Sequence, residues 1–252
     1  MSAERVLDWE GCFNVRDLGG LPTADGRRTR RGALVRSDTL CRLTAAGQAA
    51  LVAHGVRTVI DLRWPAELAR DEVPHPFRAR DGVTYLNIPI TTGRDEAEMA
   101  ANSVVFADRS LSRAQLNVLD VDYNQIGFAR ICAAVAQAPI GGVLLHCHAG
   151  KDRTGMVVAL LLALIGVPDD LIAADYAMSA LNLPALTREW LDRSSQDPAQ
   201  RARLMRQAEP LPEAIQAVLD RLRERYGGAE RYLLGGGMAP ADVPALRARL
   251  LE

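Results

Sequence analysis

The segment that most constrains this chain is "LLHCHAGKDRTGMVVALLL", residues 144–162. It starts as a short apolar run of the kind that a sheet buries on both faces. Small and polar residues follow, and an apolar helical run begins at about Thr154. The N–H groups in the first turn of a helix have no partner within the helix, and they point toward such a loop. The segment therefore predicts a strand, an anion-binding loop and a buried helix in an α/β fold.

The rest of the chain alternates short β-rich runs with helical patterns, as βα units do. This order predicts a central, mostly parallel sheet flanked by helices. The expected strands cover residues 32–38, 56–62, 83–90 and 141–148, and the expected helices cover residues 43–55, 65–71, 123–139, a run from about 154, 212–228 and 239–252. Gly227 and Gly228 are expected to cap one of these helices at its C-terminus.

No internal repeat or low-complexity linker interrupts the sequence, and 252 residues are enough to bury a core. We therefore expect one domain over residues 1–252. Two stretches do not fit the alternation: residues 91–120 are polar and weakly periodic, and residues 184–210 are rich in arginine. Each is either a surface excursion or a helical cover over the active site, and the pattern alone leaves both open.

Charge and cysteine content exclude several classes of protein. The chain has 30 Lys and Arg against 31 Asp and Glu, a net charge of -1, so no overall basic field attracts nucleic acid. Basic residues are also not interleaved with aromatic ones, and we expect no nucleic-acid partner. The four cysteines are too scattered for a disulfide framework, and no pair has zinc-ligand spacing. These observations favour a reducing, cytoplasmic compartment.

Neither a targeting segment nor a membrane span is predicted. The N-terminal "MSAERVLDWEGC" lacks the cationic-then-apolar pattern of a cleaved signal, although export by another route stays open. The longest apolar run, residues 156–167, is too short to cross a bilayer. The oligomeric state is not indicated.

Cys147 and Arg153 are the residues of the loop with the clearest chemistry. A thiolate is favoured by the positive end of a following helix and by nearby cations. A guanidinium six residues beyond a cysteine, with five residues between them, can grip two phosphate oxygens at once. Taken singly, Cys147 fits a structural cysteine, Gly150 a turn and Thr154 or Asp152 an N-cap. Together, on one short loop, they favour transfer of a phosphoryl group to the cysteine.

Lys151 is the only lysine in a chain that otherwise uses arginine for its cations. Its place in the loop would put a compact positive charge at the rim of the anion site. The other interpretation is that it offsets Asp152 or holds the loop. We favour a functional role.

The loop "HCHAGKDRTG", residues 146–155, resembles the Cys-x5-Arg-Thr loop of cysteine-dependent phosphatases, and more narrowly the bacterial tyrosine and dual-specificity group. Further similar stretches are "FNVRDLGG", "LVRSDTL", "IDLRWPAE" and "ADYAMSALNLP". The resemblance extends over nearly the whole chain. It implies a tyrosine phosphatase-like α/β fold and hydrolysis of phosphotyrosine, extending to phosphoserine, phosphothreonine and phosphoinositides. A lysine in this loop accompanies phosphoinositide activity in related enzymes.

The resemblance also implies roles for individual residues. Cys147 is the nucleophile and Arg153 the phosphate clamp, while His146 supports the thiolate and Thr154 helps to expel it. The backbone amides of His148, Ala149, Gly150 and Lys151 bind phosphate. For Asp61 and Arg63, at the C-terminal end of an expected strand, an ion pair and a role in the site are both open. Arg16 and Asp17 are expected to shape the fold beside the loop.

The leaving group also needs a proton donor. Some relatives carry an Asp shortly after the strand that corresponds to "NIPI", where this chain has "TTG" and Asp95 is the nearest carboxylate. Asp152, next to the clamp arginine, is therefore the favoured general acid.

Two other functions remain open from the sequence: a sulfur- or arsenate-handling cysteine enzyme, and an inactive phosphate-binding module. Against the first, the nearest other cysteine, Cys132, lies 15 residues upstream. Against the second, Cys147, Asp152 and Arg153 are all present. The leading hypothesis is a phosphomonoester hydrolase that acts on a phosphoprotein or a phosphoinositide. Because cysteine, arginine and aspartate suffice for this chemistry, no metal or organic cofactor is expected.

Overall fold

The computed structural model describes residues 5–71, 75–77, 82–95, 99, 105, 108, 110–194 and 196–252. Within them a five-stranded sheet has the order β1-β2-β5-β3-β4. The short edge strand β1 is antiparallel to β2, and the remaining neighbours are parallel. The strands are β1 (Arg16–Asp17), β2 (Leu34–Ser37), β3 (Val56–Asp61), β4 (Thr84–Asn87) and β5 (Gly142–His146). The predicted α/β fold with a mostly parallel sheet is confirmed.

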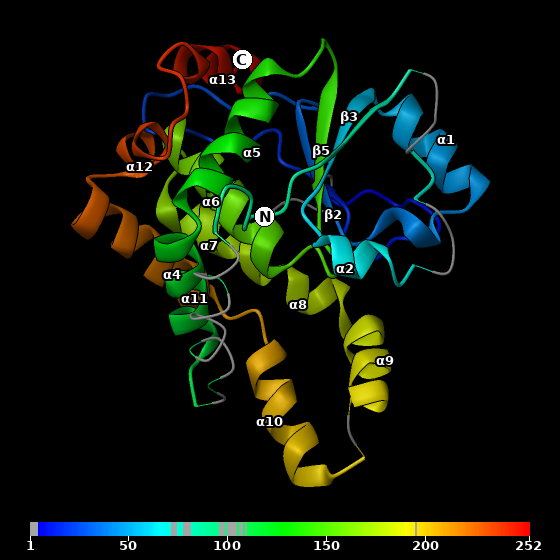
Figure 1. The fold of residues 1–252 in the computed structure, drawn as a ribbon. Coiled ribbons are helices and arrows are strands. Elements are labelled where there is room, and N and C mark those ends of the chain that lie inside the picture. The colour runs from blue at the N-terminus through cyan, green and yellow to red at the C-terminus, as the bar shows by residue number, and fades with distance from the viewer. Residues whose placement is uncertain are drawn as a thin grey trace.

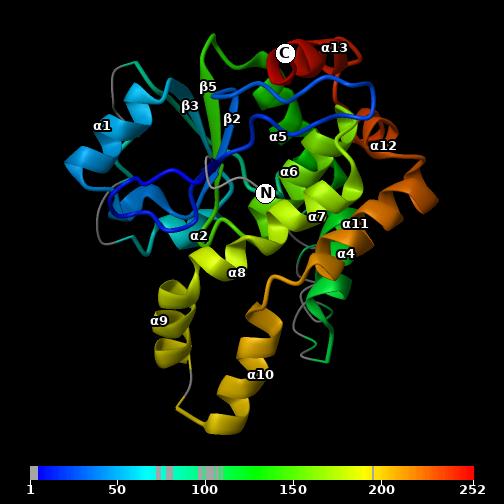
Figure 2. The same ribbon diagram turned by 180° about the vertical axis from the view of Figure 1, so that it is seen from behind.

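Helices cover both faces of the sheet, as the views from either side show (Figures 1 and 2). One face packs against the short α1 (Ala45–Ala53) and the N-terminal segment. The other face carries the larger core. Its helices include α4 (Arg113–Tyr123), α5 (Gln125–Gln137), α6 (Asp152–Leu164), α7 (Asp169–Ala177), α11 (Pro212–Arg221), α12 (Ala229–Gly235) and α13 (Asp242–Leu250).

The amino-acid sequences of β5 and α6 explain why this strand and this helix are buried. In β5 the side chains of Val143 and Leu145 enter the larger core, while Leu144 enters the smaller one. A strand that carries apolar side chains on both of its faces belongs in the middle of a parallel sheet. Helix α6 is apolar on all sides and is buried over most of its length. Strand β5 and helix α6 therefore hold the loop that connects them rigidly at one edge of the sheet. This loop covers residues 147–151.

Helix α11 continues as a π-helical turn, Leu222–Tyr226, and ends at Gly227 with φ +74°, as the glycine pair predicts. A left-handed C-cap favours glycine because a Cβ would be strained there. Helix α2 (Pro65–Leu68) and the 3-10 turn Leu40–Arg42 follow the ends of β3 and β2.

The arginine-rich stretch 184–210 forms α9 (Pro184–Ser194) and α10 (Pro198–Ala208), preceded by α8 (Ser179–Asn182). Both views show α9 and α10 projecting together from the body of the molecule (Figures 1 and 2). Much of the other predicted cover, residues 91–120, lies outside the described residues, and its last part is the start of α4. Whether the chain is a single domain stays a prediction. No helix among the described residues is long and apolar enough to cross a membrane.

Candidate active site

Cys147 follows directly on the last residue of the central strand. That residue, His146, pairs in register with Ser37 of β2 on one side and with Asp61 of β3 on the other. Helix α6 begins five residues after the cysteine, at Asp152. The cysteine is only 3% exposed. It thus lies where the carboxyl ends of three parallel strands meet the N-terminus of a helix, which is the place where α/β folds bind ligands.

Within the loop, the backbone carbonyl groups of residues 148–151 point to the groups that pack behind it. All four carbonyls accept hydrogen bonds from groups behind the loop: the backbone N–H of Thr39, the amide of Asn14 and the guanidinium of Arg36. No described acceptor binds the four N–H groups of the same residues. Successive N–H groups that point to one side form an anion-binding concavity. The predicted amide site at residues 148–151 therefore has the geometry that phosphate binding requires.

Gly150 makes this turn possible. Its φ is +63°, and a Cβ built on it would lie 2.1 Å from the carbonyl oxygen of Ser37. A side chain at this position would have to push the loop away from β2. Glycine is therefore required here on two independent grounds, the backbone angle and the close approach.

We expect Gly150→Ala to lower kcat/KM by about 100-fold or more, because a displacement of about 1 Å in a catalytic loop costs that much. Gly166→Ala is the matched control, since Gly166 also has a positive φ, +83°, but has open space around it. Both variants should lose about 1–2 kcal/mol of stability from the backbone strain. Phosphate release and thermal unfolding measured on both would separate strain from displacement. Equal activity in the two variants would contradict the loop geometry.

Arg153 is held by Glu67, a residue to which sequence analysis assigned no role. The two terminal nitrogens of the guanidinium lie 2.5 and 2.9 Å from the two carboxylate oxygens, and the guanidinium stacks over the Trp64 ring at 4.6 Å. Burial opposes the charge on Arg153, but the bonds to Glu67 outweigh it and raise the pKa of the guanidinium. Two of its five N–H groups are used in this way, which leaves the others for an oxyanion.

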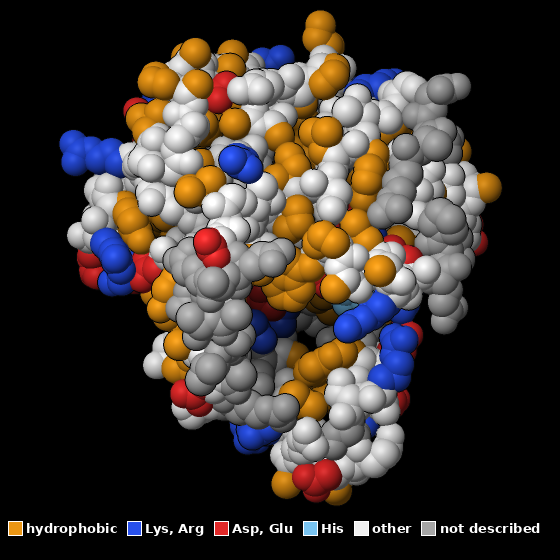
Figure 3. All heavy atoms as spheres, viewed as in Figure 1, with side chains coloured by type: hydrophobic (Ala, Val, Ile, Leu, Met, Phe, Trp, Pro, Cys, Tyr) orange, Lys and Arg blue, Asp and Glu red, His pale blue; other side chains and the backbone are white. Residues whose placement is uncertain are grey.

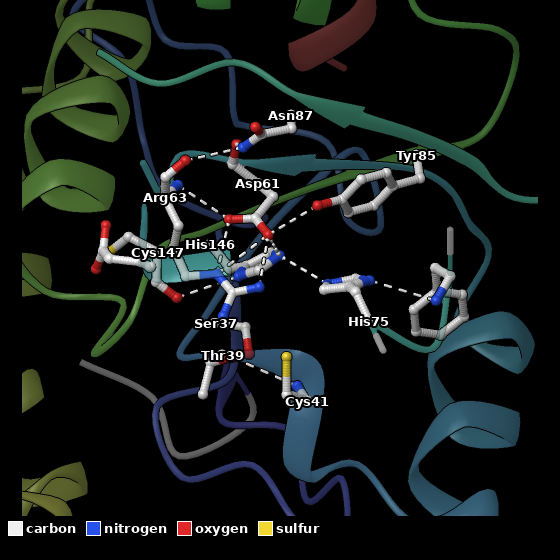
Figure 4. Close-up of polar contacts among 12 residues, drawn as sticks. Ser37, Thr39, Cys41, Asp61, Arg63, His75, Tyr85, Asn87, His146 and Cys147 are labelled. Atoms are coloured by element: carbon white, nitrogen blue, oxygen red, sulfur yellow. Dashed lines mark hydrogen bonds and ion pairs between the residues drawn. The ribbon is translucent and has the colours of Figure 1, made fainter. Parts of the chain in front are cut away.

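His146 is buried next to Cys147 and is hydrogen-bonded on both ring nitrogens (Figure 4). Its Nδ1 lies 3.1 Å from the carbonyl oxygen of Cys147, so Nδ1 carries the proton and donates. Its Nε2 lies 3.1 Å from Nε2 of His75, whose Nδ1 accepts from the N–H of Phe77 at 3.3 Å. Burial lowers the pKa of His146 in spite of the Asp61 carboxylate nearby. A neutral His146 therefore fixes the orientation of the peptide group that carries the cysteine.

Asp61 and Arg63 form the ion pair that the sequence left as one of two possibilities, and the pair lies against His146 (Figure 4). The Arg63 guanidinium donates to Asp61 at 2.9 and 3.1 Å, and the hydroxyl of Tyr85 donates at 3.0 Å. Burial alone would raise the pKa of Asp61, but the charge and hydrogen bonds of the Arg63 guanidinium outweigh burial and hold this pKa below its usual range. The carboxylate is thus ionised, and it lies 3.6 Å from Nε2 of His146.

Asp61, His75 and His146 also place three metal-ligand atoms within 4.8 Å of one another. Their hydrogen bonds do not leave these atoms available for an ion. The N–H of Phe77 occupies Nδ1 of His75, so the proton of that ring is on Nε2 and points at His146. The carboxylate is bound by a guanidinium, which would also repel a cation. The trio fits a hydrogen-bonded support for the loop better than a metal centre.

Asp152 lies in the first turn of α6 and is partly exposed, at 24%. The hydroxyl of Tyr176 donates to it at 2.6 Å, and the cations of Lys151 and Arg113 lie 3.5 and 3.6 Å away. Burial would raise the pKa of Asp152, but these cations and the hydroxyl hold it below its usual range. In this state the predicted general acid is therefore ionised.

Lys151 is buried, at 7% exposed, rather than standing at an open rim. Its ammonium donates to the carbonyl of Ala208 at the end of α10 and lies beside Asp152. Burial lowers the pKa of Lys151. The sequence could not indicate this, because Ala208, the residue of α10 that accepts from the lysine, lies 57 residues away along the chain.

Asp120 of α4 is a further carboxyl that sequence analysis missed. Burial, and then the negative charge of Asp152, raise its pKa to about 7, although Arg153 opposes the shift. Asp120 and Asp152 are thus two interacting carboxyls whose environments push their pKa values apart. Such pairs commonly divide acid and base roles between them.

Thr154 also has a feature that points to function. Its hydroxyl oxygen is buried and has no hydrogen-bond partner within the described residues. A buried hydroxyl left without a partner costs free energy and calls for an explanation. Its position seven residues after the cysteine, in the first turn of α6, suits the predicted donation to a thiolate.

A cavity of about 870 Å³ lies between the loop, α9 and α10. The hollow is visible in Figure 3, with basic and hydrophobic side chains at its edge. His148, Lys151 and Asp152 form its floor, and its walls are largely apolar. Two contacts join the walls to the site: Arg42 pairs with Glu189 of α9 at 3.0 Å, and Lys151 binds the end of α10.

The fold places a cysteine at the start of an amide-lined loop, at the carboxyl edge of an α/β sheet. The family model and the curated relatives name the class of protein in which the chain belongs. A family model described as "Tyrosine phosphatase family" matches residues 7–252. The triple specificity protein phosphatase PtpB of Mycobacterium tuberculosis is 31% identical over 284 aligned residues, covering 98% of this chain and 99% of the relative. A tyrosine-protein phosphatase of Nostoc commune is 34% identical over 223 residues, covering 86% of this chain and 74% of the relative. The crystal structure of P. aeruginosa TpbA aligns with a TM-score of 0.36 at 17% identity, covering 88% of each chain.

The chain therefore belongs to the tyrosine phosphatase family, and it is an enzyme of the protein-tyrosine phosphatase class. The resemblance seen in the loop sequence is confirmed.

Proposed function

We propose that this protein hydrolyses phosphomonoesters through a cysteinyl-phosphate intermediate. Its substrates are phosphotyrosine, phosphoserine and phosphothreonine in proteins, and phosphoinositides. The observation that carries the proposal is the loop itself. There a cysteine, the first turn of α6 and four N–H groups that have no acceptor among the described residues lie together. A thiolate and an oxyanion clamp on one loop suit in-line displacement at phosphorus.

The reaction has two balanced steps. In the first, the Cys147 thiolate forms a bond to phosphorus while the bond to the ester oxygen breaks and that oxygen takes a proton. In the second, water attacks phosphorus, a carboxylate accepts a proton from it, and the thiolate leaves with inorganic phosphate as the product. Arg153 and the loop amides bind the equatorial oxygens in both steps. The Thr154 hydroxyl donates a hydrogen bond to the departing thiolate.

Asp152 and Asp120 supply the proton as a pair. Asp152 is next to the loop, while Asp120 is the carboxyl that holds a proton near neutral pH. Two carboxyls that interact titrate together, so the proton belongs to the pair rather than to one residue. A bound phosphate dianion adds negative charge beside Asp152 and raises its pKa, which makes Asp152 the donor in the complex.

We expect Asp152→Asn to lower kcat for alkyl phosphates by about 100-fold or more, and kcat for an activated aryl phosphate far less, because a good leaving group needs no proton. Asp120→Asn should remove the fall in kcat that we expect as the pH rises through about 7, where the Asp120 proton is lost. Asp25→Asn, on an exposed carboxylate paired with Arg27, is the control. Near-normal turnover of Asp152→Asn on alkyl phosphates would remove this assignment.

The breadth of substrates rests on the cavity and on a relative. A space of about 870 Å³ is larger than a phosphotyrosine side chain alone needs, and it combines apolar walls with the arginines of α9 and α10. The relative from Mycobacterium tuberculosis, which this chain matches over almost its full length, is named a triple specificity protein phosphatase.

Phosphate release tests the proposal directly. The wild-type protein is assayed on a phosphotyrosine peptide, a phosphoserine peptide and a set of monophosphorylated phosphoinositides. Acid quenching during turnover, followed by peptide mass spectrometry, locates any phosphoryl group on the enzyme. We expect release from all three classes and a phosphoryl group on the peptide that contains Cys147. Phosphate binding without release would indicate a binding module, and turnover of thiosulfate or arsenate instead would indicate the sulfur- or arsenate-handling class.

A further inference from the structure

Three arginines surround one aspartate behind the catalytic loop. The guanidinium groups of Arg16 and Arg36 lie 3.1 and 2.7 Å from the two oxygens of Asp175, and Arg5 contacts the same carboxylate. All four side chains are buried, with 5% exposure or less. We call these four residues the arginine cluster. They come from three of the sequence stretches that resemble the family and from the N-terminal segment.

The arginine cluster carries more positive than negative charge. Three guanidiniums face one carboxylate, so two positive charges have no carboxylate partner within the cluster. Burial, together with the neighbouring Arg36, lowers the pKa of Arg16 to about 10, which still leaves it charged at neutral pH. Burying a charge without a counter-ion costs several kcal/mol. A purely structural ion cluster would be expected to balance its charges.

The excess charge is directly connected to the loop. One terminal nitrogen of Arg36 donates to the carbonyl oxygens of Gly150 at 2.7 Å and Lys151 at 3.2 Å. The amide of Asn14 donates to the carbonyls of Ala149 and Gly150 at 3.0 and 3.2 Å, and its own oxygen accepts from Arg16 at 2.6 Å. These bonds turn three loop carbonyls away from the anion site.

We propose that Arg36, held by Asp175 and assisted by Asn14, is a positioning residue that orients the loop amides toward the bound dianion and supplies part of its counter-charge. A peptide group is rigid, so a carbonyl that is held on one side directs the N–H of the next residue to the other side. The thiolate and the phosphate dianion lie across the loop from the unbalanced guanidiniums, in a region of low dielectric. The inference rests on the proposed phosphatase function and deepens it.

The test uses Arg36→Met, which removes both the charge and the hydrogen bonds, and Arg36→Lys, which keeps the charge. Alkylation of Cys147 by iodoacetamide is followed against pH, and inorganic phosphate is titrated as a protecting ligand. Arg221→Lys is the matched control, since Arg221 also grips a carboxylate, Asp122, outside the loop. Neither readout needs turnover, so each is informative even if no substrate is hydrolysed.

We expect Arg36→Met to weaken protection by phosphate by about 10- to 100-fold, the value of one or two hydrogen bonds to a charged group. The midpoint pH of alkylation should rise, because the positive charge that Arg36 holds behind the loop is lost. In Arg36→Lys the midpoint pH of alkylation should be closer to the wild-type value than the affinity for phosphate is. Arg221→Lys should change neither quantity.

Unchanged phosphate protection and an unchanged midpoint in a folded Arg36→Met protein would overturn the inference, even if its melting temperature falls. If Arg36→Met does not fold, Asn14→Ala provides the test. It removes two of the hydrogen bonds to the loop but leaves the charge of the arginine cluster intact, and it should weaken phosphate protection without moving the midpoint. If the wild type alkylates and binds phosphate normally but hydrolyses no phosphoester, the proposed function fails while the inference about Arg36 is still decided.

Discussion

Cys147→Ser is expected to lower kcat by about four orders of magnitude or more on every substrate class, with KM changed little. A serine hydroxyl ionises far less readily than a thiol, and the ring of His146 donates to the Cys147 carbonyl instead of accepting a proton from the side chain at position 147. Removing a nucleophile has an effect of this size when the rest of the site is intact. The measurement is phosphate release at saturating substrate, with the acid-quench trap in parallel.

The control for this prediction is Cys132→Ser, at a cysteine that is fully buried in the larger core. Burial raises the pKa of the Cys132 thiol strongly, so it is not a nucleophile. Its replacement should cost stability but leave kcat nearly unchanged. Phosphate release that persists in Cys147→Ser, with a phosphoryl group trapped elsewhere, would contradict the cysteinyl-phosphate mechanism.

Arg153→Lys is expected to lower kcat/KM by about 1000-fold, the second largest effect. The positive charge is kept, but a lysine cannot bind two phosphate oxygens and Glu67 at the same time. Losing aligned donors to the transition-state oxygens costs about 100- to 1000-fold in rate, and weaker ground-state binding raises KM in addition. Steady-state kinetics on a phosphotyrosine peptide would measure both parameters.

Glu67→Gln tests how much of the effect of Arg153 depends on its orientation, because the arginine is kept and only its partner is changed. The glutamine still accepts one hydrogen bond from the guanidinium but not two, so we expect a fall in kcat/KM of about 10-fold, which corresponds to roughly one hydrogen bond. Arg27→Lys is the comparison, because Arg27 also binds a carboxylate, Asp25, and both side chains are exposed. If Arg153→Lys retained most of the activity, the two-pronged grip would not be essential.

The part of the site that could be predicted from the sequence is local along the chain. Cys147, Arg153, Asp152 and Thr154 lie within eight residues, and an apolar strand before them and an apolar helix after them leave one geometry for the loop. The same pattern predicted the parallel sheet, because a strand that is apolar at every position must be covered on both faces.

The partners of those residues could not be predicted, because they are distant in sequence. Glu67 lies 86 residues from the arginine that it holds, and Arg36 lies 114 residues from the carbonyl of Gly150. Asn14, His75 and Asp175 carry ordinary side chains in unremarkable local patterns, and only the chain path brings them behind the loop. Long-range contacts of this kind leave no periodicity that a sequence reader could use.

The electrostatic character of the site was also decided by the tertiary structure. From the sequence, Lys151 would stand at an exposed rim and Asp152 would be the acid. In the fold, α10 covers the lysine, cations hold the pKa of Asp152 down, and burial raises that of Asp120 to about 7. The order of residues by itself thus determined which groups are predicted to perform the chemistry, since their spacing is local. Their charge states and orientation depend on burial and on neighbours from distant segments, which only the folded chain brings together.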